Sequence, residues 1–442
     1  MAGGMKVRNG SPSRWNPARV RMKFQKNCWN LPLTLLCAVV TIMVLRGTFG
    51  FRSVMNPPEF RLEDDFEGEE AFEKEHMRNL AAMREKLKGA KQEKSTTEPE
   101  SDPSTVPYSL GPKISNWNEQ RAEWLEKNPH KKTPEGGQPK ILLVTGSQPY
   151  PCENPIGDHY LLKSIKNKID YCRLHDIDIF YNIAEIDEEM FGFWAKLPLI
   201  RKLMLAHPEV EWIWWMDSDA MFTDMVFKLP IQKYRDYSMV VHGYDDLIYE
   251  NHNWVGLNTG SFLLRNNQWA LDLLEIWAPM GPKGVRVEAG KMLTAKLEGR
   301  PTFEADDQSA LIYLLVTREK ELRKQVYLEN DYYLHGYWMI LVERFEEMME
   351  KSHPGLGDET WPFVTHFVGC KPCKPSFANI GEAELARCMA QMERAFNFGD
   401  NQILEHYGLQ HQALSTPMVK KIRNDSSTPL DFLNQTVWTP LI

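Results

Sequence analysis

The stretch "EWIWWMDSDAMFTDM", residues 211–225, joins a run of aromatic and aliphatic side chains to two carboxylates, Asp217 and Asp219. Residues 211–216 are apolar on both faces, which is typical of an interior strand of a parallel sheet. In open α/β sheets, ligands bind beyond the carboxyl ends of the strands, and both aspartates directly follow this strand. The stretch therefore predicts a buried strand that carries two acidic groups to a binding site.

The residues on either side predict alternating strands and helices. We expect strands at 140–147, 176–182, 238–243 and 261–266, and helices at 158–175, 191–206, 267–277, 307–317 and 338–351. In the first helix, the apolar face is predicted to hold Leu161, Leu162, Ile165, Ile169 and Cys172. This order predicts an α/β fold with a Rossmann-like, mixed and mostly parallel central sheet and right-handed crossovers.

Charge is distributed unevenly along the 442 residues. The net formal charge is −8, but residues 1–46 hold eight Lys or Arg and no acid, which leaves 44 basic and 60 acidic residues, or −16, for the remainder. Binding to nucleic acid phosphates needs a basic surface. The acidic body therefore excludes nucleic acid as a partner and suits a protein that gathers metal cations.

Residues 29–45 contain no charged side chain and are just long enough to span a bilayer. Seven of the eight N-terminal basic residues precede them, which predicts a cytoplasmic tail at 1–28 and a single-pass anchor at 29–45. A cleaved signal peptide is the alternative, but its apolar stretch would begin earlier and end at small residues.

The remaining chain divides by composition. Residues 46–135 are predicted to form a stem, in part disordered, with a solvated or amphipathic helix at 66–91 and a flexible spacer rich in Ser, Thr, Pro and Glu at 95–112. A globular domain is expected at 136–425 and a C-terminal tail at 426–442.

Two features predict that the domain lies in a lumenal, oxidising compartment. Asn424 and Asn434 are in glycosylation sequons. Beyond the anchor, Cys residues at 152, 172, 370, 373 and 388 predict two disulfides and one free thiol, with the pairing left open. Cys370 and Cys373 could instead begin a zinc or redox site, but a second Cys pair is absent from the sequence.

Asp217 and Asp219 are candidate metal ligands, because carboxylates next to three Trp need a cation to offset desolvation. Oxygen ligands that leave positions open for phosphate suit Mn²⁺ or Mg²⁺. The alternative is a strand-to-turn junction in which each Asp bonds its own backbone, and the pair Asp176 and Asp178 repeats the same spacing. Glycine-rich nucleotide loops of the G-x-x-x-x-G-K-[ST] and G-x-G-x-x-G types are absent, as are H-E-x-x-H and G-x-S-x-G.

Two downstream residues could complete this site. His366 ends a short apolar strand in "FVTHFVGCKPC" and could be a third ligand or a core histidine. Lys371 could neutralise a phosphate or lie in a solvated loop.

Asp306 and Asp307 open a helix in "FEADDQSALIYLLV". Acids at a helix start are ordinary capping chemistry, but two adjacent carboxylates near a metal and a sugar could also stabilise an oxocarbenium-like centre or fix an acceptor hydroxyl. The rings of "YYLHGYW", residues 332–338, could stack on sugars or pack in the core.

Five blocks together resemble one known family. They are "VTGSQPYPCENPIGDHYLLKSIKNKIDYC" (144–172), "FWAKLPLIRKLMLAHPEVEWIWWMDSDAMFTDMVF" (193–227), "VGLNTGSFLLRNNQWALDLLEIWAPMGPKG" (255–284), "PTFEADDQSALIYLL" (301–315) and "WPFVTHFVGCKPC" (361–373). In this order they closely resemble the plant xyloglucan 6-xylosyltransferases of glycosyltransferase family 34, which also includes galactomannan 6-galactosyltransferases. The likeness runs from about Lys140 to about Arg423 and is far more specific than a D-x-D pair.

The resemblance implies a GT-A type nucleotide-sugar transferase fold and a retaining enzyme that moves xylose from UDP-α-xylose to O6 of glucose in a β-1,4-glucan. It implies Mn²⁺, or Mg²⁺ in its place, on Asp217, Asp219 and His366. The implied site residues are, for the donor, Thr145, Gly146, Ser147, Lys196, Asp217, Ser218, Gly369 and Lys371; beside the reacting sugar, Asp306, Asp307 and Gln308; and for the acceptor, Asn258, His335, Gly336 and Trp338.

The resemblance also implies a Golgi membrane location with a lumenal domain, and dimers with related glycosyltransferases or a glucan synthase as partners. Three alternatives stay open: a galactosyltransferase acting on mannan, a largely non-catalytic scaffold and a lumenal lectin. "GLNTGSFLLRN", residues 256–266, is more similar to the xylosyl branch. Whether an Asp acts as nucleophile or stabilises positive charge while a phosphate oxygen takes the proton is also open, and we favour the second.

Overall fold

The computed structural model describes residues 108–134, 137–370, 372–373 and 382–423. Several predicted features lie outside these residues, namely the tail at 1–28, the anchor at 29–45, the stem up to residue 107, Lys371, Asn424, Asn434 and the C-terminal tail at 426–442. None of the helices in the described part of the chain is long and apolar enough to cross a membrane.

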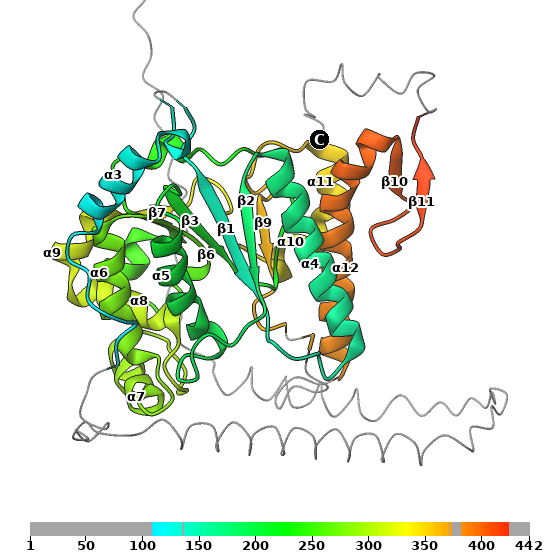
Figure 1. The fold of residues 1–442 in the computed structure, drawn as a ribbon. Coiled ribbons are helices and arrows are strands. Elements are labelled where there is room, and N and C mark those ends of the chain that lie inside the picture. The colour runs from blue at the N-terminus through cyan, green and yellow to red at the C-terminus, as the bar shows by residue number, and fades with distance from the viewer. Residues whose placement is uncertain (1–107, 135–136, 371, 374–381, 424–442) are drawn as a thin grey trace, which may run out of the picture. The chain divides into compact units, whose positions relative to one another are not determined.

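A six-stranded sheet in the order β2-β1-β3-β6-β5-β7 forms the centre of the fold (Figure 1). Its strands are β1 Ile141–Gly146, β2 Asp178–Asn182, β3 Trp212–Met216, β5 Met239–Gly243, β6 Leu257–Arg265 and β7 Val326–Glu329. Strand β6 is antiparallel to both β3 and β5, and the other neighbouring strands pair in parallel. The predicted mixed, mostly parallel sheet is therefore confirmed.

Strand β3 is in the interior of this sheet, and all five of its residues are buried. Ile213 and Trp215 pack into the core on one face, whereas Trp212, Trp214 and Met216 pack into the core on the other. The prediction of an interior strand covered on both faces is confirmed. One neighbour of β3, strand β6, is antiparallel to it. The apolar pattern could not predict this, since burial of both faces does not dictate the direction of the adjacent strand.

Three helices cover the Trp215 face of the sheet: α5 Lys196–Ala206, α6 Gln268–Trp277 and α8 Asp307–Thr317. The Trp214 face packs against α4 Pro155–Leu174 and a smaller sheet, whose order is β4-β9-β8. Figure 1 shows α5, α6 and α8 on one side of β1 and β3, and α4 on the other side. The smaller sheet consists of β4 Ala220–Phe222, β8 Gly336–Tyr337 and β9 Val364–His366.

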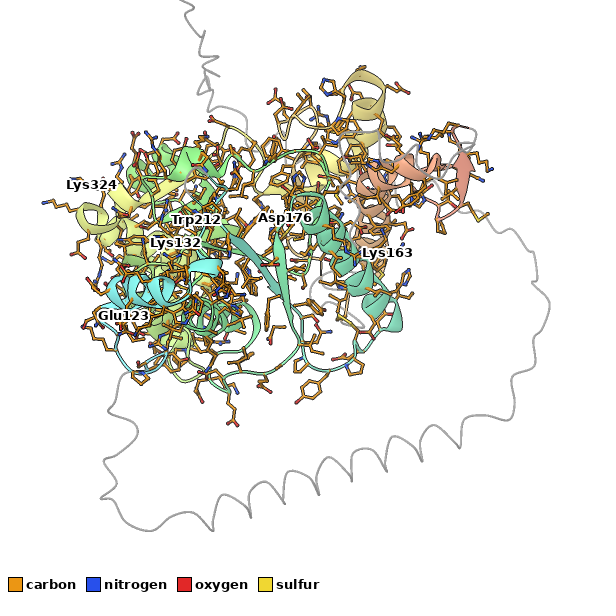
Figure 2. All side chains as sticks on the ribbon, turned by 45° about the horizontal axis from the view of Figure 1, so that its top comes forward. Glu123, Lys132, Lys163, Asp176, Trp212 and Lys324 are labelled. Carbon is orange, nitrogen blue, oxygen red and sulfur yellow. A yellow bond between two sulfur atoms is a disulfide. The ribbon has the colours of Figure 1, made fainter. Side chains whose placement is uncertain are left out.

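The remaining elements flank these layers. They are α3 Trp117–Lys127, α7 Arg286–Lys296, α9 Glu319–Leu322, α10 Trp338–Leu341, α11 Phe345–Lys351, α12 Glu382–Leu404, β10 Leu409–His411 and β11 Val419–Lys421. The helix expected at 338–351 is divided into α10 and α11 by a 3₁₀ turn at Val342–Arg344. Helix α12 packs along α4, and Lys163 of α4, labelled in Figure 2, pairs with Glu393 of α12.

The buried face of α4 is more polar than predicted. Leu162 is 63% exposed, whereas Ser164, Asn167 and Lys168 are buried. The amide of Asn167 bonds both the N–H and the carbonyl of Phe222, at 2.7 and 2.8 Å. Main-chain groups of β4 and the preceding turn need partners in the interior, and polar side chains of α4 supply them.

Residues 108–134, assigned to the stem from composition, contact the domain. Trp117 of α3 is buried, and its indole N–H donates to Asn266 Oδ1 at 2.8 Å. The Arg121 guanidinium donates to the carbonyls of Pro208 and Val210. The folded unit therefore begins before residue 136.

Replacing Trp117 with Ala should lower the free energy of unfolding by about 3 kcal/mol, because a buried indole and its hydrogen bond are lost. Chemical unfolding of the full-length protein measures this. Glu119→Ala, at an exposed position of the same helix, is the control and should change stability by less than about 0.5 kcal/mol. Equal stability of the Trp117 variant and wild type would show that α3 is not part of the folded unit.

Candidate active site

Asp217, Asp219 and His366 meet at the carboxyl end of β3. One potential ligand atom from each residue lies within 4.8 Å of the others. His366 Nε2 lies 3.1 Å from Asp219 Oδ1 and 3.9 Å from Asp217 Oδ2. The structure thus brings together the three residues that the sequence proposed as metal ligands.

Backbone pairing of two short strands brings His366 to the aspartates. Strands β4 and β9 are antiparallel, with Ala220 opposite His366, and the Phe367 N–H donates to the Asp219 carbonyl at 2.9 Å. On the other side, the Asp217 N–H donates to the Gly260 carbonyl of β6 at 2.7 Å. Main-chain hydrogen bonds from two sheets therefore fix the ends of the Asp217–Asp219 turn.

The chemistry of these three side chains fits a hard divalent cation. They offer carboxylate oxygens and one imidazole nitrogen without a thiol, which suits Mn²⁺ or Mg²⁺. The side chains of Asp217 and Asp219 are 27% and 28% exposed, so a cation and a second ligand can reach them. Burial opposes ionisation of Asp219, but His366, a backbone hydrogen bond and Lys168 together lower the pKa of this carboxyl. The Trp215 indole N–H also donates to Asp217 Oδ1 at 2.6 Å.

Lys196, at the start of α5, connects the metal cluster to Asp307. Its Nζ lies 3.2 Å from Asp217 Oδ1 and 2.8 Å from Asp307 Oδ2, and it donates to the Thr259 carbonyl at 3.1 Å. Its side chain is only 2% exposed. Burial disfavours the charged ammonium, yet the two carboxylates raise the pKa of Lys196 above its ordinary value. Lys196 is therefore a buried counter-ion shared by two carboxylates.

The neighbours Asp306 and Asp307 have different surroundings. Asp306 caps α8, because its Oδ1 accepts the Ser309 N–H at 2.7 Å while its Oδ2 accepts from the buried Arg300 at 2.9 Å. Asp307 points toward Lys196 instead, and burial raises its pKa to about 6, a rise that Lys196 limits. Capping thus accounts for Asp306, and Asp307 is the carboxylate at the site.

The side chains of Gln308 and Asn258 are hydrogen-bonded to each other. The Asn258 amide donates to Gln308 Oε1 at 3.0 Å, and Gln308 Nε2 donates to the Trp254 carbonyl at 3.0 Å. Asn258 Oδ1 accepts the Gly260 N–H at 2.8 Å. Because β6 runs antiparallel to β3, its first residues lie beside the end of β3, which brings Asn258 and Gly260 to the site.

The predicted acceptor residues differ in accessibility. His335 is half-buried, and its Nδ1 lies 2.9 Å from His366 Nδ1. Trp338 is buried, stacks on Phe367 and donates to the Val368 carbonyl, so its ring belongs to the core and cannot stack on a sugar here. A Cβ at Gly336 would lie 2.5 Å from the Val364 carbonyl oxygen, so this glycine permits close packing of β8 on β9.

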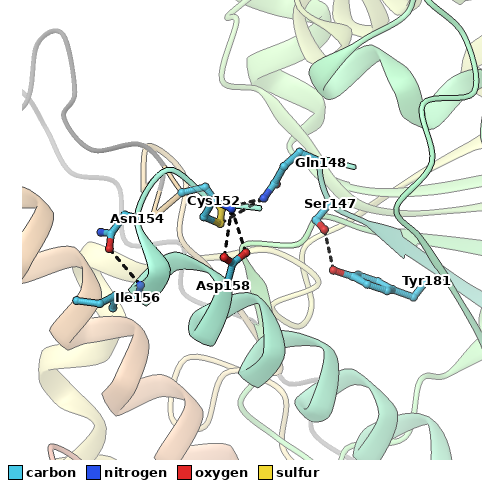
Figure 3. The surroundings of a disulfide bond; sticks show 8 residues. Ser147, Gln148, Cys152, Asn154, Ile156, Asp158 and Tyr181 are labelled. Carbon is cyan, nitrogen blue, oxygen red and sulfur yellow. Dashed lines mark hydrogen bonds between the residues drawn. A yellow bond between two sulfur atoms is a disulfide. The ribbon is translucent and has the colours of Figure 1, made fainter. Parts of the chain in front are cut away.

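The end of β1 supplies the residues assigned to the donor nucleotide. Thr145 is buried, and its hydroxyl has no hydrogen-bond partner within the described residues. A Cβ at Gly146 would lie 2.6 Å from the Asn182 carbonyl oxygen, so Gly146 allows close approach of β2. The Ser147 hydroxyl bonds the Tyr181 hydroxyl at 2.7 Å, as Figure 3 shows.

Two disulfides flank the segment that follows His366. Cys152 pairs with Cys373, Cys370 pairs with Cys388 of α12, and Cys172 is a buried free thiol. The predicted number of disulfides and free thiols is therefore confirmed, and the zinc and redox alternatives do not apply. The Asp158 carboxylate accepts the Cys152 N–H, which fixes the loop after β1 to the start of α4 (Figure 3). Gly369 lies in the chain between His366 and the two disulfide-bonded residues Cys370 and Cys373. Its φ is +87°, and no atom lies within 4 Å of the position that a Cβ would take.

Sequence reasoning missed Ser164 and Lys168, which lie behind the metal cluster. The Ser164 hydroxyl donates to the Ser218 carbonyl at 2.5 Å, and Lys168 Nζ donates to the Ala220 carbonyl at 2.7 Å and to Ser164 Oγ at 2.6 Å. Their side chains thus hold the main chain of the turn through the carbonyls of Ser218 and Ala220. The available signal was that Ser164 and Lys168 are four residues apart and so lie on one face of the helix. The apolar residues of the same helix led us to predict a different, apolar buried face.

Asp176 and Asp178, the second pair with this spacing, do not join the site. Asp176, labelled in Figure 2, has φ 54° in a turn that precedes β2, whereas Asp217 follows β3. Since β2 and β3 both pair in parallel with β1, the two motifs lie at opposite ends of these strands. Asp176 therefore lies in a turn, away from the metal cluster.

Comparison with known proteins gave one matching family model, described as the galactosyl transferase GMA12/MNN10 family, over residues 137–376. Two curated relatives from Arabidopsis thaliana are xyloglucan 6-xylosyltransferase 1, 55% identical over 421 residues, and xyloglucan 6-xylosyltransferase 2, 54% identical over 439 residues. These alignments cover 90% and 93% of this chain, and 90% and 94% of those relatives. A solved structure of a glycosyltransferase involved in glycosylation of the major capsid of PBCV-1 is 16% identical, with a TM-score of 0.33 over 57% of this chain and 98% of that chain.

Burial lowers the pKa of Lys168 to about 7, although Asp219 and Asp217 act in the opposite direction. The unfolded chain keeps the ordinary, higher pKa, so folding releases a proton from Lys168 above about pH 7 and stability rises with pH there. In EDTA, the thermal unfolding midpoint of wild type should rise from about pH 7 to about pH 8.5 relative to that of Lys168→Met. An identical pH dependence in both proteins would contradict this assignment.

Proposed function

The chain belongs to the galactosyl transferase GMA12/MNN10 family, and from this premise we propose that it is a xyloglucan 6-xylosyltransferase. It transfers xylose from UDP-α-D-xylose to O6 of glucose in a β-1,4-glucan and forms α-1,6-xylosyl branches. The identity of 54–55% to the two Arabidopsis enzymes across nearly the whole chain carries this proposal. The cluster of Asp217, Asp219, His366, Lys196 and Asp307 favours an active transferase over a non-catalytic scaffold.

The family description alone includes galactosyl transfer, so it does not select the donor sugar. Both relatives reported above are named for xyloglucan, which favours the xylosyl over the galactosyl alternative. A mannan galactosyltransferase would use the same metal cluster. Donor assays therefore distinguish the two.

Asp217, Asp219 and His366 are the proposed ligands of Mn²⁺, or of Mg²⁺ in its place. A divalent cation at this position would neutralise the diphosphate of the donor and favour departure of UDP. The Thr145–Ser147 loop is proposed to hold the nucleotide, with Ser218, Gly369 and Lys371 near the diphosphate. The hydroxyl of Thr145, which has no hydrogen-bond partner in the described part of the chain, supports this, because a buried polar atom needs a hydrogen bond that a ligand could supply.

Asp307 is proposed to stabilise the positive charge that develops on the anomeric carbon as UDP departs. Its ion pair with Lys196 supports charge stabilisation over attack, because a carboxylate shared with an ammonium is a weaker nucleophile. The O6 hydroxyl then approaches on the face that UDP leaves, forms the C–O bond and passes its proton to a phosphate oxygen of UDP. Donor and product are both α, so the reaction retains configuration.

We further propose a single-pass protein of the Golgi membrane with its domain in the lumen. The uncharged stretch at 29–45, the sequons at Asn424 and Asn434 and the two disulfides support this location. A β-1,4-glucan acceptor follows from the proposed reaction. Association with a second glycosyltransferase or a glucan synthase stays a prediction.

Wild-type protein should form xylosylated product from UDP-xylose, Mn²⁺ and cello-oligosaccharides, and Asp219→Ala should abolish this Mn²⁺-dependent transfer while retaining the wild-type unfolding midpoint. The reason is that one carboxylate ligand is lost while the Asp219 carbonyl keeps its backbone hydrogen bond. Mass spectrometry of the oligosaccharides measures product.

Product from UDP-galactose and manno-oligosaccharides alone would overturn the xylosyl assignment. Unchanged turnover by Asp219→Ala would overturn the metal site. Oligosaccharide binding that is indifferent to UDP and Mn²⁺, without any transfer, would identify a lectin instead.

The adjacent acids provide a matched pair for the proposed charge stabilisation. Asp307→Asn should lower kcat by about 100-fold or more, because the negative charge at the site is removed. Asp306→Asn should keep most of the activity, because Asn is also a good helix N-cap and Asp306 faces Arg300 and Ser309. Turnover of both variants under saturating donor and acceptor measures this, and the reverse ranking would assign the catalytic role to Asp306.

A further inference from the structure

We propose that His335 is a positioning residue that holds His366 with its Nε2 lone pair directed at the cation. This inference rests on the proposed metal site and adds a residue that does not itself bind the ion. His335 was expected to contact the acceptor sugar, so the inference assigns it a different role.

The two imidazoles are in direct contact through the same type of atom. His366 Nδ1 and His335 Nδ1 are 2.9 Å apart, and the rings meet edge to face at 87° with centroids 4.9 Å apart. His366 Nε2 points the other way, toward Asp219 Oδ1 at 3.1 Å. In the described part of the chain, His335 is the hydrogen-bond partner of His366 Nδ1.

This contact determines where the protons are located. A neutral imidazole carries one N–H, so His366 can ligate through Nε2 only if its proton is on Nδ1. The His366 Nδ1–H must then donate a hydrogen bond to the lone pair of His335 Nδ1, so His335 carries its own proton on Nε2. His335 therefore selects the tautomer of His366 that binds metal, as outer-sphere partners of ligating histidines do in other sites.

The backbone keeps both rings in place. His335 directly precedes β8, which pairs in parallel with β9 and sets Tyr337 opposite His366. Leu334 is fully buried, and Gly336 packs against β9. A Cβ at Gly260 would lie 2.0 Å from His366 Cε1, so the ring of His366 rests against bare backbone. Contacts with Gly260 and His335 thus restrict rotation of the His366 ring.

The test measures Mn²⁺ binding directly, without donor or acceptor. The Kd of the full-length protein for Mn²⁺ is determined from the electron paramagnetic resonance signal of free Mn²⁺. His335→Phe keeps a ring of similar size but offers no acceptor, and its Kd should rise about tenfold or more. His335→Asn offers an amide oxygen near the position of Nδ1 and should keep the Kd within about threefold of wild type.

Two further variants keep the test decisive. His353→Phe is the matched control, because His353 is exposed and, among the described residues, bonds only the adjacent Pro354 carbonyl; its Kd should equal that of wild type. His335→Gln is polar but places its amide oxygen one bond further out, so it should bind Mn²⁺ more weakly than His335→Asn. If His335→Phe fails to fold, as judged by thermal unfolding, the Asn and Gln variants decide.

The outcomes separate this inference from the proposed function. Wild-type affinity for Mn²⁺ in a folded His335→Phe, or equal affinities for Asn and Gln, would overturn the inference and leave the metal site standing. A raised KM for cello-oligosaccharide with an unchanged Kd for Mn²⁺ would assign His335 to the acceptor instead. Wild-type protein that binds no Mn²⁺ would overturn the metal site and this inference together.

Discussion

The carboxylates of Asp217, Asp219 and Asp307 lie together at the end of one buried strand, and the surrounding structure must offset their mutual repulsion. Two unit charges 4 Å apart interact by about 4 kcal/mol at an effective dielectric constant of about 20, a large share of the stability of a typical domain. The chain meets this cost with one buried ammonium, that of Lys196, and with nitrogen groups from other elements. Lys196 lies between Asp217 and Asp307, the imidazole of His366 lies against Asp219, and the amino group of Lys168 donates to the Ala220 carbonyl at the end of the turn. A divalent cation would complete the same balance.

The topology of the sheets explains how distant segments supply these groups. Reversal of β6 brings its first residues, rather than its last, to the end of β3, so Thr259 and Gly260 contribute main-chain groups beside Asp217. The smaller sheet then uses three short strands to bring His366 and His335 to the other side of the turn. Backbone hydrogen bonds, which are directional, give these side chains less freedom than a loop alone would give them.

Two disulfides hold the segment that follows His366. Cys370 and Cys373 each pair with a distant cysteine, one on α12 and one in the loop after β1. The loop after β1, the segment after His366 and the two long helices α4 and α12 are thereby connected around one site. Such cross-links reduce the conformational freedom of a segment that the proposed function needs to hold against a diphosphate.

The sequence by itself determined the interior position of β3, the mixed and mostly parallel sheet, the number of disulfides and the identity of the three clustered residues, because these follow from local apolar patterns, cysteine counts and family-specific blocks. It could not separate Asp306 from Asp307, since two adjacent acids at a helix start look alike until Arg300 and Lys196 are placed beside them. Nor could it show that Trp338 is buried or that Ser164 and Lys168 support the turn. Those roles depend on contacts between residues far apart in the chain, and only the tertiary structure decides which side chain of a pair meets a partner and which meets solvent.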